Sequence, residues 1–183
     1  MSTSAEFSPE RGGDARAAAE RAAGPDGFVL SQARLDDPDI VALIEQVQGE
    51  YVVRYGGPDE APIDPQEFDP PSGRFLLGCE DGRPVAMGGW RIVGPGRAEL
   101  RRMFVVAPAR GRGLARRLLI TLEDDARAAG VRELVLNTGV EQPEAVALYR
   151  GHGYVDVAPF GHYATAPGAI FLGKSLTGGT RPG

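Results

Sequence analysis

The fold is decided by residues 110–130, which read RGRGLARRLLITLEDDARAAG. Apolar side chains recur there at steps of four, at Leu114, Leu118, Leu122 and Ala126. This spacing predicts an amphipathic helix, because residues four apart lie on one face of a helix. Gly130 follows the last turn, where a glycine commonly ends a helix. The segment therefore predicts one well-packed helix that begins directly after a loop rich in glycine and arginine.

That loop has the composition of an anion-binding site. The first turn of a helix leaves N–H groups unpaired and carries a partial positive charge. Gly111 and Gly113 would let the backbone approach a ligand closely. Residues 97–117 contain seven arginines against one carboxylate, Glu99, and the loop itself supplies Arg110, Arg112 and Arg116. A turn that only caps the helix is the alternative interpretation of the same residues.

The common nucleotide-binding motifs do not fit this loop. A Walker loop requires Gly-Lys-Ser/Thr, which the chain does not contain. A dinucleotide-binding fingerprint requires a third glycine or alanine where Arg116 stands. The anion is therefore expected to be held in another type of site.

Apolar runs and turn residues on either side predict the remaining elements. Before the loop we expect a strand, a helix, an irregular acidic loop and three antiparallel strands, over residues 28–30, 36–55, 56–73, 75–80, 84–93 and 97–106. Asp81-Gly82 predicts a two-residue hairpin turn, and Gly88-Gly89 predicts a bulge or a close backbone approach. After the helix we expect a strand, a short helix and two strands, over 134–136, 143–150, 154–157 and 169–172. The fold class is α+β, in the order β-α-loop-β-β-β-α-β-α-β-β.

Composition limits the class of protein. The chain has 183 residues, 42% hydrophobic and 25% charged, which is typical of one globular domain. Its net charge of −5 argues against general nucleic-acid binding. A single cysteine, Cys79, excludes an intrachain disulfide and a cysteine-rich zinc site. We predict no signal peptide, no membrane span and a cytoplasmic location.

One domain is expected over residues 27–176. Residues 1–26 contain too few large apolar side chains to order themselves, so a disordered tail is predicted there. A short helix over residues 14–23 is the alternative, since alanine, arginine and glutamate favour helix. Residues 177–183 are predicted to form a flexible tail.

Two motifs resemble the GNAT superfamily of acetyl-CoA-dependent N-acetyltransferases. Arg110-x-x-Gly113-x-Ala115 is similar to its pyrophosphate loop, Gln/Arg-x-x-Gly-x-Gly/Ala. Residues 145–154, AVALYRGHGY, are similar to Ala-x-x-Leu-Tyr-x-x-x-Gly-Phe/Tyr. The resemblance implies a mixed, mostly antiparallel central sheet flanked by helices, whose fourth and fifth strands splay apart to admit the pantetheine arm. It also implies acetyl-CoA as cosubstrate and no metal.

The resemblance places the acetyl-CoA site on the fourth strand, the loop and the following helix. The residues implied are Met103, Phe104, Val105, Val106, Arg110, Gly111, Arg112, Gly113, Leu114, Ala115 and Arg116. Asn137 is similar to a polar residue that faces the cofactor arm. Gln142 stands where the family often has an asparagine that binds the cofactor. Glutamine keeps the amide group, but its side chain is longer by one methylene.

The resemblance also implies the catalytic pair. Glu99 lies on the fourth strand at the spacing of a general base, which would take a proton from an amine with a pKa of about 10. Tyr149 matches the tyrosine that donates a proton to the departing thiolate. An ion pair of Glu99 with Arg97 or Arg101 on a solvated face is the alternative for the first. A core aromatic beside Leu148 is the alternative for the second.

Other reactive side chains are assigned no chemistry. Cys79 is expected to be a small apolar residue in a strand. His152 and His162 are too few for a metal site. No nucleophile has the base and oxyanion loop that a serine or cysteine hydrolase requires.

The acceptor is predicted to be a primary amine of a small molecule. Five carboxylates in residues 56–73, Asp59, Glu60, Asp64, Glu67 and Asp69, would suit a cationic amine, although a solvated acidic loop is the alternative. A noncatalytic acyl-CoA-binding regulatory module, or an acetyltransferase of protein N-termini or lysines, remains the competing function. We expect a monomer or homodimer without nucleic-acid or membrane partners.

Overall fold

The computed structural model describes residues 27–177. The sequence order of its elements is the predicted one, with two short 3-10 turns added, and the predicted fold class is confirmed: β1 Phe28–Ala33, α2 Pro38–Tyr55, η1 Pro65–Phe68, β2 Gly73–Glu80, β3 Arg83–Gly94, β4 Arg97–Val105, η2 Ala107–Ala109, α3 Leu114–Ala128, β5 Glu133–Gly139, α4 Pro143–Gly151, β6 Val155–Asp156 and β7 Ala169–Ser175. The predictions for residues 1–26 and 178–183 lie outside the described residues.

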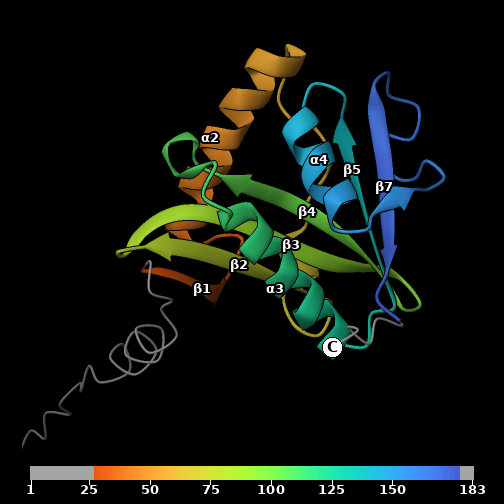
Figure 1. The fold of residues 1–183 in the computed structure, drawn as a ribbon, viewed down its shortest axis with the longest axis horizontal. Helices are drawn as coiled ribbons and strands as arrows, with labels where there is room; N and C mark the ends of the chain where they lie inside the picture. Colours follow the sequence, from red (N-terminus) through yellow and green to blue (C-terminus); the bar gives the residue numbers. More distant parts are fainter. Residues whose placement is uncertain (1–26, 178–183) are drawn as a thin grey trace, which may run out of the picture.

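The strands form one seven-stranded sheet in the order β1-β2-β3-β4-β5-β7-β6. Neighbouring strands are antiparallel except β4 and β5, which run parallel. These two strands pair over only three residue pairs, from Arg97↔Glu133 to Glu99↔Val135, and then diverge (Figure 1). The divergence opens the sheet beyond Glu99 and Val135, where several of the candidate site residues lie.

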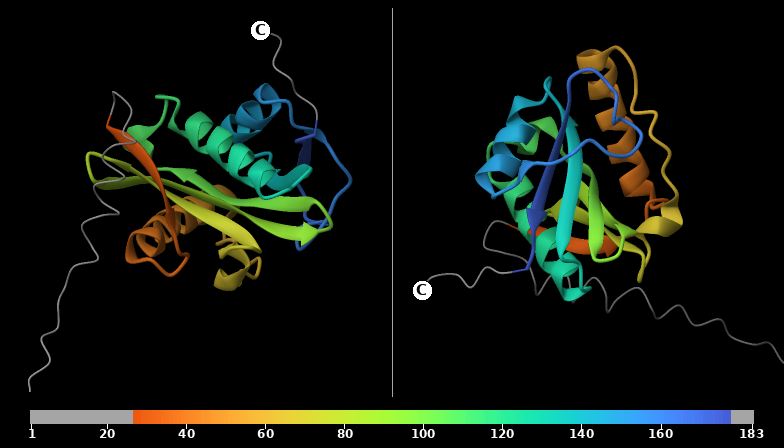
Figure 2. Two further views of the ribbon diagram at one scale, coloured as in Figure 1. Left: turned by 90° about the horizontal axis from the view of Figure 1, so that it is seen from below. Right: turned by 90° about the vertical axis from the view of Figure 1, so that its right-hand side faces the viewer.

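Helices cover both faces of the sheet and make two cores. Helices α3 and α4 lie on one face, while α2 and η1 lie on the other (Figure 2). The leucines predicted to form the buried stripe of α3 are buried in the first core, with Tyr149 and Tyr154. Ile40, Leu43 and Val47 of α2 pack in the second core, with Phe68 and Phe75 among its members. Within residues 27–177, no helix combines the length and the apolar character that a bilayer crossing needs.

Local signals account for most element ends. The Asp37 side chain accepts from the Asp39 N–H at 3.0 Å, so α2 begins two residues later than predicted, at Pro38. Asp81 and Gly82 both have positive φ, 48° and 76°, as the predicted hairpin requires. Strands β1, β5 and β7 are longer than predicted, because backbone pairing continues past their apolar residues. Strand β6 is shorter than predicted, because Tyr154 enters the core instead of the sheet.

A bulge interrupts the pairing of β3 with β4, where Gly88-Gly89 predicted one. Met87 pairs with Phe104 and Gly89 with Arg101, so β4 carries one residue more than β3 across this interval. Arg102 occupies the bulge with φ 57°, in the left-handed region. The backbone at Gly89 also lies close to its neighbours, as predicted, since a Cβ added there would be 2.4 Å from the Phe75 ring.

Shortening a leucine of α3 should destabilise the domain strongly. Leu122 is fully buried, so Leu122→Ala should lower the free energy of unfolding by about 2–5 kcal/mol through lost burial and a cavity. Ile120→Ala on the exposed side of the same helix is the matched control, with an expected loss of less than about 1 kcal/mol. Urea unfolding measures both, and equal losses would contradict the assigned core.

Candidate functional site

A groove of about 330 Å³ runs from the diverging end of β4 to the start of α3. Most of the residues predicted to bind the cofactor line it: Met103, Phe104, Val105, Arg110, Gly111, Gly113, Leu114, Ala115, Arg116 and Gln142. Gly113 precedes α3 with φ 79°, a left-handed conformation that favours glycine, and the first helical N–H groups follow it. The groove can therefore receive an anionic group at a helix N-terminus, as the loop predicted.

The arginines of the loop have different partners. Arg110 donates to the Val105 carbonyl at 2.8 Å and pairs with Glu50 of α2, so it ties the loop to the body of the protein. Arg116 lines the groove, with its Nε 3.2 Å from His152 Nε2. Arg112 does not line the groove, because it pairs with Glu80 at the end of β2. Of the loop's arginines, Arg110 and Arg116 therefore contribute to the groove wall, together with Arg54 of α2.

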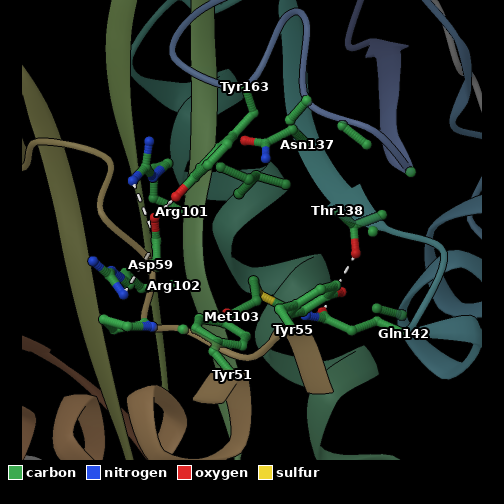
Figure 3. A pocket seen from close by; sticks show the side chains of 18 of the residues that line it. Tyr51, Tyr55, Asp59, Arg101, Arg102, Met103, Asn137, Thr138, Gln142 and Tyr163 are labelled. Atoms are coloured by element: carbon green, nitrogen blue, oxygen red, sulfur yellow. Dashed lines mark hydrogen bonds and ion pairs between the residues drawn. The ribbon is translucent and has the colours of Figure 1, made fainter. Parts of the chain in front are cut away.

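Two further predicted cofactor residues also lie outside the groove. The Val106 N–H bonds to the Val85 carbonyl at 2.9 Å, and the Val106 side chain packs against both cores. Asn137 of β5 faces a second hollow instead (Figure 3). Neither residue lines the groove, and a contact of either with the cofactor stays a prediction.

This second hollow, the inner cavity, occupies about 260 Å³ between the diverging strands. Its walls come from β4, β5, α4, the end of α2, the Gly57–Asp59 segment and the loop before β7. Five residues line both the groove and the inner cavity: Tyr51, Met103, Gln142, Ala145 and Tyr149. A thioester reaching the end of the groove would therefore meet an acceptor in the inner cavity near Met103 and Tyr149.

Tyr149 stands at the junction of the two hollows. Its ring is buried and packs edge-to-face against Tyr154, with centroids 5.5 Å apart. Burial raises the pKa of its phenol well above the usual value, and the charge of Tyr51 acts in the same direction. Tyr149 therefore lines both hollows and is also part of the first core. Because its pKa is raised, the phenol carries its proton at neutral pH.

Glu99 lies beside the inner cavity but does not line it. Its side chain is 7% exposed. Arg91 on β3 donates to Glu99 from Nε at 3.1 Å and from Nη2 at 2.9 Å. Arg101 Nη1 lies 3.5 Å from the other oxygen. The alternative interpretation, an ion pair of Glu99, is thus observed with Arg101, but this pair is buried and not on a solvated face. Arg97 does not pair with Glu99, because it pairs with Glu133.

Three charged residues line the inner cavity, and the sequence reasoning had named one of them, Asp59, as an acceptor-site candidate while missing the two arginines. They are Asp59, Arg101 and Arg102 (Figure 3). Asp59 accepts from the Tyr163 hydroxyl at 2.5 Å and lies 3.2 Å from Arg102 Nη1. Gln48 holds the Asp59 backbone by bonding both its N–H and its carbonyl. Two adjacent arginines in an apolar strand were a visible signal, but strict alternation would have sent them to opposite faces.

The acidic loop does not supply a cluster of carboxylates to the cavity. Of its five acidic residues, Asp59 alone lines the inner cavity. Asp64 caps η1, Glu67 pairs with Arg91, and Asp69 pairs with Arg34. Glu60 is exposed. Most of the loop's carboxylates are thus engaged in ion pairs and a cap, which argues against a broadly acidic acceptor site.

The remaining candidates have structural surroundings. Cys79 is half-buried near the end of β2, beside the second core, and burial raises the pKa of its thiol. His152 Nδ1 lies 2.7 Å from the Leu148 carbonyl. In residues 27–177, no group of three or more histidine, cysteine or acidic side chains is placed to hold a metal ion.

A mixed sheet that splays between its fourth and fifth strands, with a groove ending at a helix N-terminus, matches the arrangement that the resemblance implies for an acetyl-CoA-dependent transferase. The chain belongs to the acetyltransferase (GNAT) family, whose model matches residues 40–154. The chain is accordingly an acyltransferase enzyme.

Relatives cover nearly the whole domain. The IAA acetyltransferase of Azospirillum brasilense is 38% identical over 153 residues, which make up 83% of this chain and 99% of that protein. A solved structure from Klebsiella pneumoniae, provisionally described as an acyl-CoA N-acyltransferase, is 26% identical with a TM-score of 0.69 and covers 81% of this chain and 97% of its own. The GNAT acetyltransferase of Streptococcus pneumoniae, 19% identical with a TM-score of 0.63, covers 81% and 99% and shares the fold.

Proposed function

We propose that the enzyme transfers an acetyl group from acetyl-CoA directly to the primary amine of a small molecule. The observation that carries this proposal is the junction of the groove and the inner cavity at Met103 and Tyr149. Acetyl-CoA would lie in the groove with its pyrophosphate at the start of α3. The backbone of Met103 to Val105 would face the pantetheine arm and offer an N–H to the thioester oxygen. The acceptor amine would then attack from the inner cavity.

Proton transfers would be divided between the two walls of the junction. The attacking amine must lose a proton, and the thiolate of coenzyme A must gain one. Tyr149 is the proposed donor to the sulfur because its protonated phenol lines both hollows. Glu99 is the proposed base, acting through water because its carboxylate does not line the cavity. Asp59 is the carboxylate that reaches the cavity directly, so it is the competing base.

Thiol release from acetyl-CoA over a library of small amines tests the proposed reaction. Turnover with at least one amine, with the acetylated product identified by mass spectrometry, is the expected result. Calorimetric binding of acetyl-CoA without turnover on any amine would instead support a noncatalytic acyl-CoA-binding module. Turnover on peptide N-termini or lysines alone would support a protein acetyltransferase.

The name of the 38% identical relative supports a small-molecule acceptor, since that protein is an IAA acetyltransferase. The inner cavity also supports one. Two of its walls are joined by hydrogen bonds of the Tyr163 hydroxyl. This hydroxyl accepts from the Glu60 N–H at 3.1 Å and donates to Asp59. This contact joins the last loop to the segment after α2, so an acceptor between them is bounded on both sides.

The identity of the base should appear in the pH profile. Glu99→Gln should lower kcat/KM at neutral pH by roughly 100-fold if Glu99 removes the proton. The deficit should shrink as the pH rises toward about 10, where the amine is already neutral. Asp59→Asn is the paired variant, measured over the same pH range. A profile altered by Asp59→Asn and not by Glu99→Gln would remove Glu99 from the mechanism.

A further inference from the structure

The charged wall of the inner cavity ends a chain of alternating ion pairs. This series of residues is called here the ion-pair chain. It begins at the exposed side chain of Glu67 and runs inward through Arg91, Glu99, Arg101, Asp59 and Arg102. Each acid lies within ion-pair distance of its neighbours along this order. Three acids balance three arginines, so the ion-pair chain as a whole is neutral. Its inner end, however, is a guanidinium.

The inner end is incompletely satisfied. Arg101 and Arg102 are only 9% and 8% exposed, and both line the inner cavity. Within the described part of the chain, Arg101 Nη2, Arg102 Nε and Arg102 Nη1 are buried without a hydrogen-bond partner. Asp59 is near both side chains, at 3.7 Å from Arg101 Nη2 and 3.2 Å from Arg102 Nη1. Its Oδ1 oxygen is already taken by the Tyr163 hydroxyl and the Ala61 N–H.

Leaving buried donors of a charged group unpaired is costly, and an acceptor group of a ligand in the cavity would complete them. The charged residues lining the cavity are two arginines and one aspartate, so the lining carries an excess of one positive charge. A guanidinium presents a planar fork of donors that matches a carboxylate. One excess positive charge suits a monoanionic carboxylate better than a dianionic phosphate.

The bulge in β4 is what makes this arrangement. An extra residue at Arg102 breaks the alternation of side chains, so Arg101 and Arg102 both reach the same cavity from adjacent positions. Arg102 adopts φ 57° as a result, a conformation that a residue other than glycine rarely adopts. Strain of this kind persists where the surroundings fix it, and it is often found at ligand-binding positions. Figure 3 shows Asp59 between the two arginines, across the cavity from Thr138 and Gln142.

We infer that the acceptor is an amine that also carries a carboxylate, held by Arg101 and Arg102, with its amino group directed toward the junction at Tyr149. This inference rests on the proposed acetyl transfer and specifies its substrate class. It replaces the simple cationic amine that the acidic loop had suggested. Amino acids are the plainest members of this class.

Matched pairs of acceptors test the inference. L-amino acids and the corresponding amino acid amides are each offered with acetyl-CoA, and kcat/KM is measured by thiol release. The acids should exceed their amides by roughly 10- to 100-fold, as expected for a charge-assisted pair. Arg102→Gln should reduce this ratio to about one by slowing the acids only. Arg102→Lys, which keeps the charge, should retain part of the preference.

Arg91→Gln is the control variant. It removes one arginine from the same ion-pair chain, but Arg91 does not line the inner cavity. Whatever its effect on the rate, the ratio of acids to amides should stay at the wild-type value. Circular dichroism and acetyl-CoA calorimetry on each variant confirm that it is folded.

The outcomes separate the inference from the proposed function. Equal turnover of acids and amides by the wild type would overturn the carboxylate site while leaving the acetyl transfer intact. If no amine is acetylated, the proposed function fails, and binding decides the inference. N-acetyl amino acids should then bind the CoA-saturated wild type more tightly than N-acetyl amino acid amides, and Arg102→Gln should abolish the difference. Equal binding would overturn the inference.

Discussion

Tyr149→Phe should lower kcat roughly 100-fold while leaving the dissociation constant of acetyl-CoA within about twofold, because it removes only the proposed proton donor. The ring that packs against Tyr154 is retained, so the fold should be unaffected. Single-turnover measurements of thiol release, together with calorimetry, separate the chemical step from binding. Wild-type turnover in the variant would refute the role of Tyr149.

Tyr154→Phe provides a matched control for this prediction. Tyr154 is a buried tyrosine beside Tyr149, but its hydroxyl lies near Glu123 and it lines neither hollow. Removing that hydroxyl should leave kcat within about twofold of the wild type. An equal loss of kcat in both variants would indicate a general disturbance of the core rather than lost proton transfer.

The pH dependence of the reaction should reflect the burial of Tyr149. Burial raises the pKa of this phenol above its usual value of about 10, so the folded enzyme keeps the proton where free tyrosine ionises. The kcat of the wild type should therefore not fall between about pH 8 and pH 10 through loss of this proton. The unfolded chain does ionise near pH 10, so the associated stability is present below that pH and is lost as the pH rises further.

Gly113→Val should raise the KM for acetyl-CoA roughly 30-fold, because it destroys the anion-binding geometry before α3. Gly113 has φ +79°, and a Cβ added there would meet open space, so the penalty comes from the backbone rather than from a clash. A β-branched residue avoids this conformation, and the loop must change shape to accommodate it. Steady-state kinetics with acetyl-CoA as the varied substrate measures the effect.

Gly130→Val is the matched control, because it introduces the same backbone strain at a position far from the groove. Gly130 has φ +85°, also with open space, and it follows the other end of α3. Both variants should lose about 1–2 kcal/mol of stability, but only Gly113→Val should change the KM for acetyl-CoA. A similar rise in KM in both variants would show that the loop has no special contact with the cofactor.

Local chemistry made much of the fold predictable. The four-residue repeat of α3, the Asp81-Gly82 turn and Gly130 each act on residues close in sequence, and each appears in the structure as expected. One wall of the groove was predictable for the same reason, since the loop and the start of α3 are contiguous, but α2 and α4 complete the groove from far along the chain. Tyr149 lies with the rest of its motif on one short helix, where the two hollows meet, and its role as proton donor stays a prediction.

The surroundings of the catalytic candidates were decided only by tertiary structure. Arg91 meets Glu99 because the register of β3 and β4 sets them opposite each other. The pairing of Asp59 with Tyr163 joins residues 104 positions apart. No local pattern encodes either contact, because each depends on strand register and on how a loop returns to the sheet.

By itself, then, the sequence determined the order of elements, the amphipathic helix and the loop of glycine and arginine before it, since these depend on neighbours within a few turns. The tertiary structure decided which charges face the acceptor. A one-residue bulge at Arg102 turned two adjacent arginines toward one cavity, and ion pairs withdrew Glu99 and most of the acidic loop from it. The physical reason is that pleat and bulge, set by pairing across the sheet, fix the direction of every side chain on a strand.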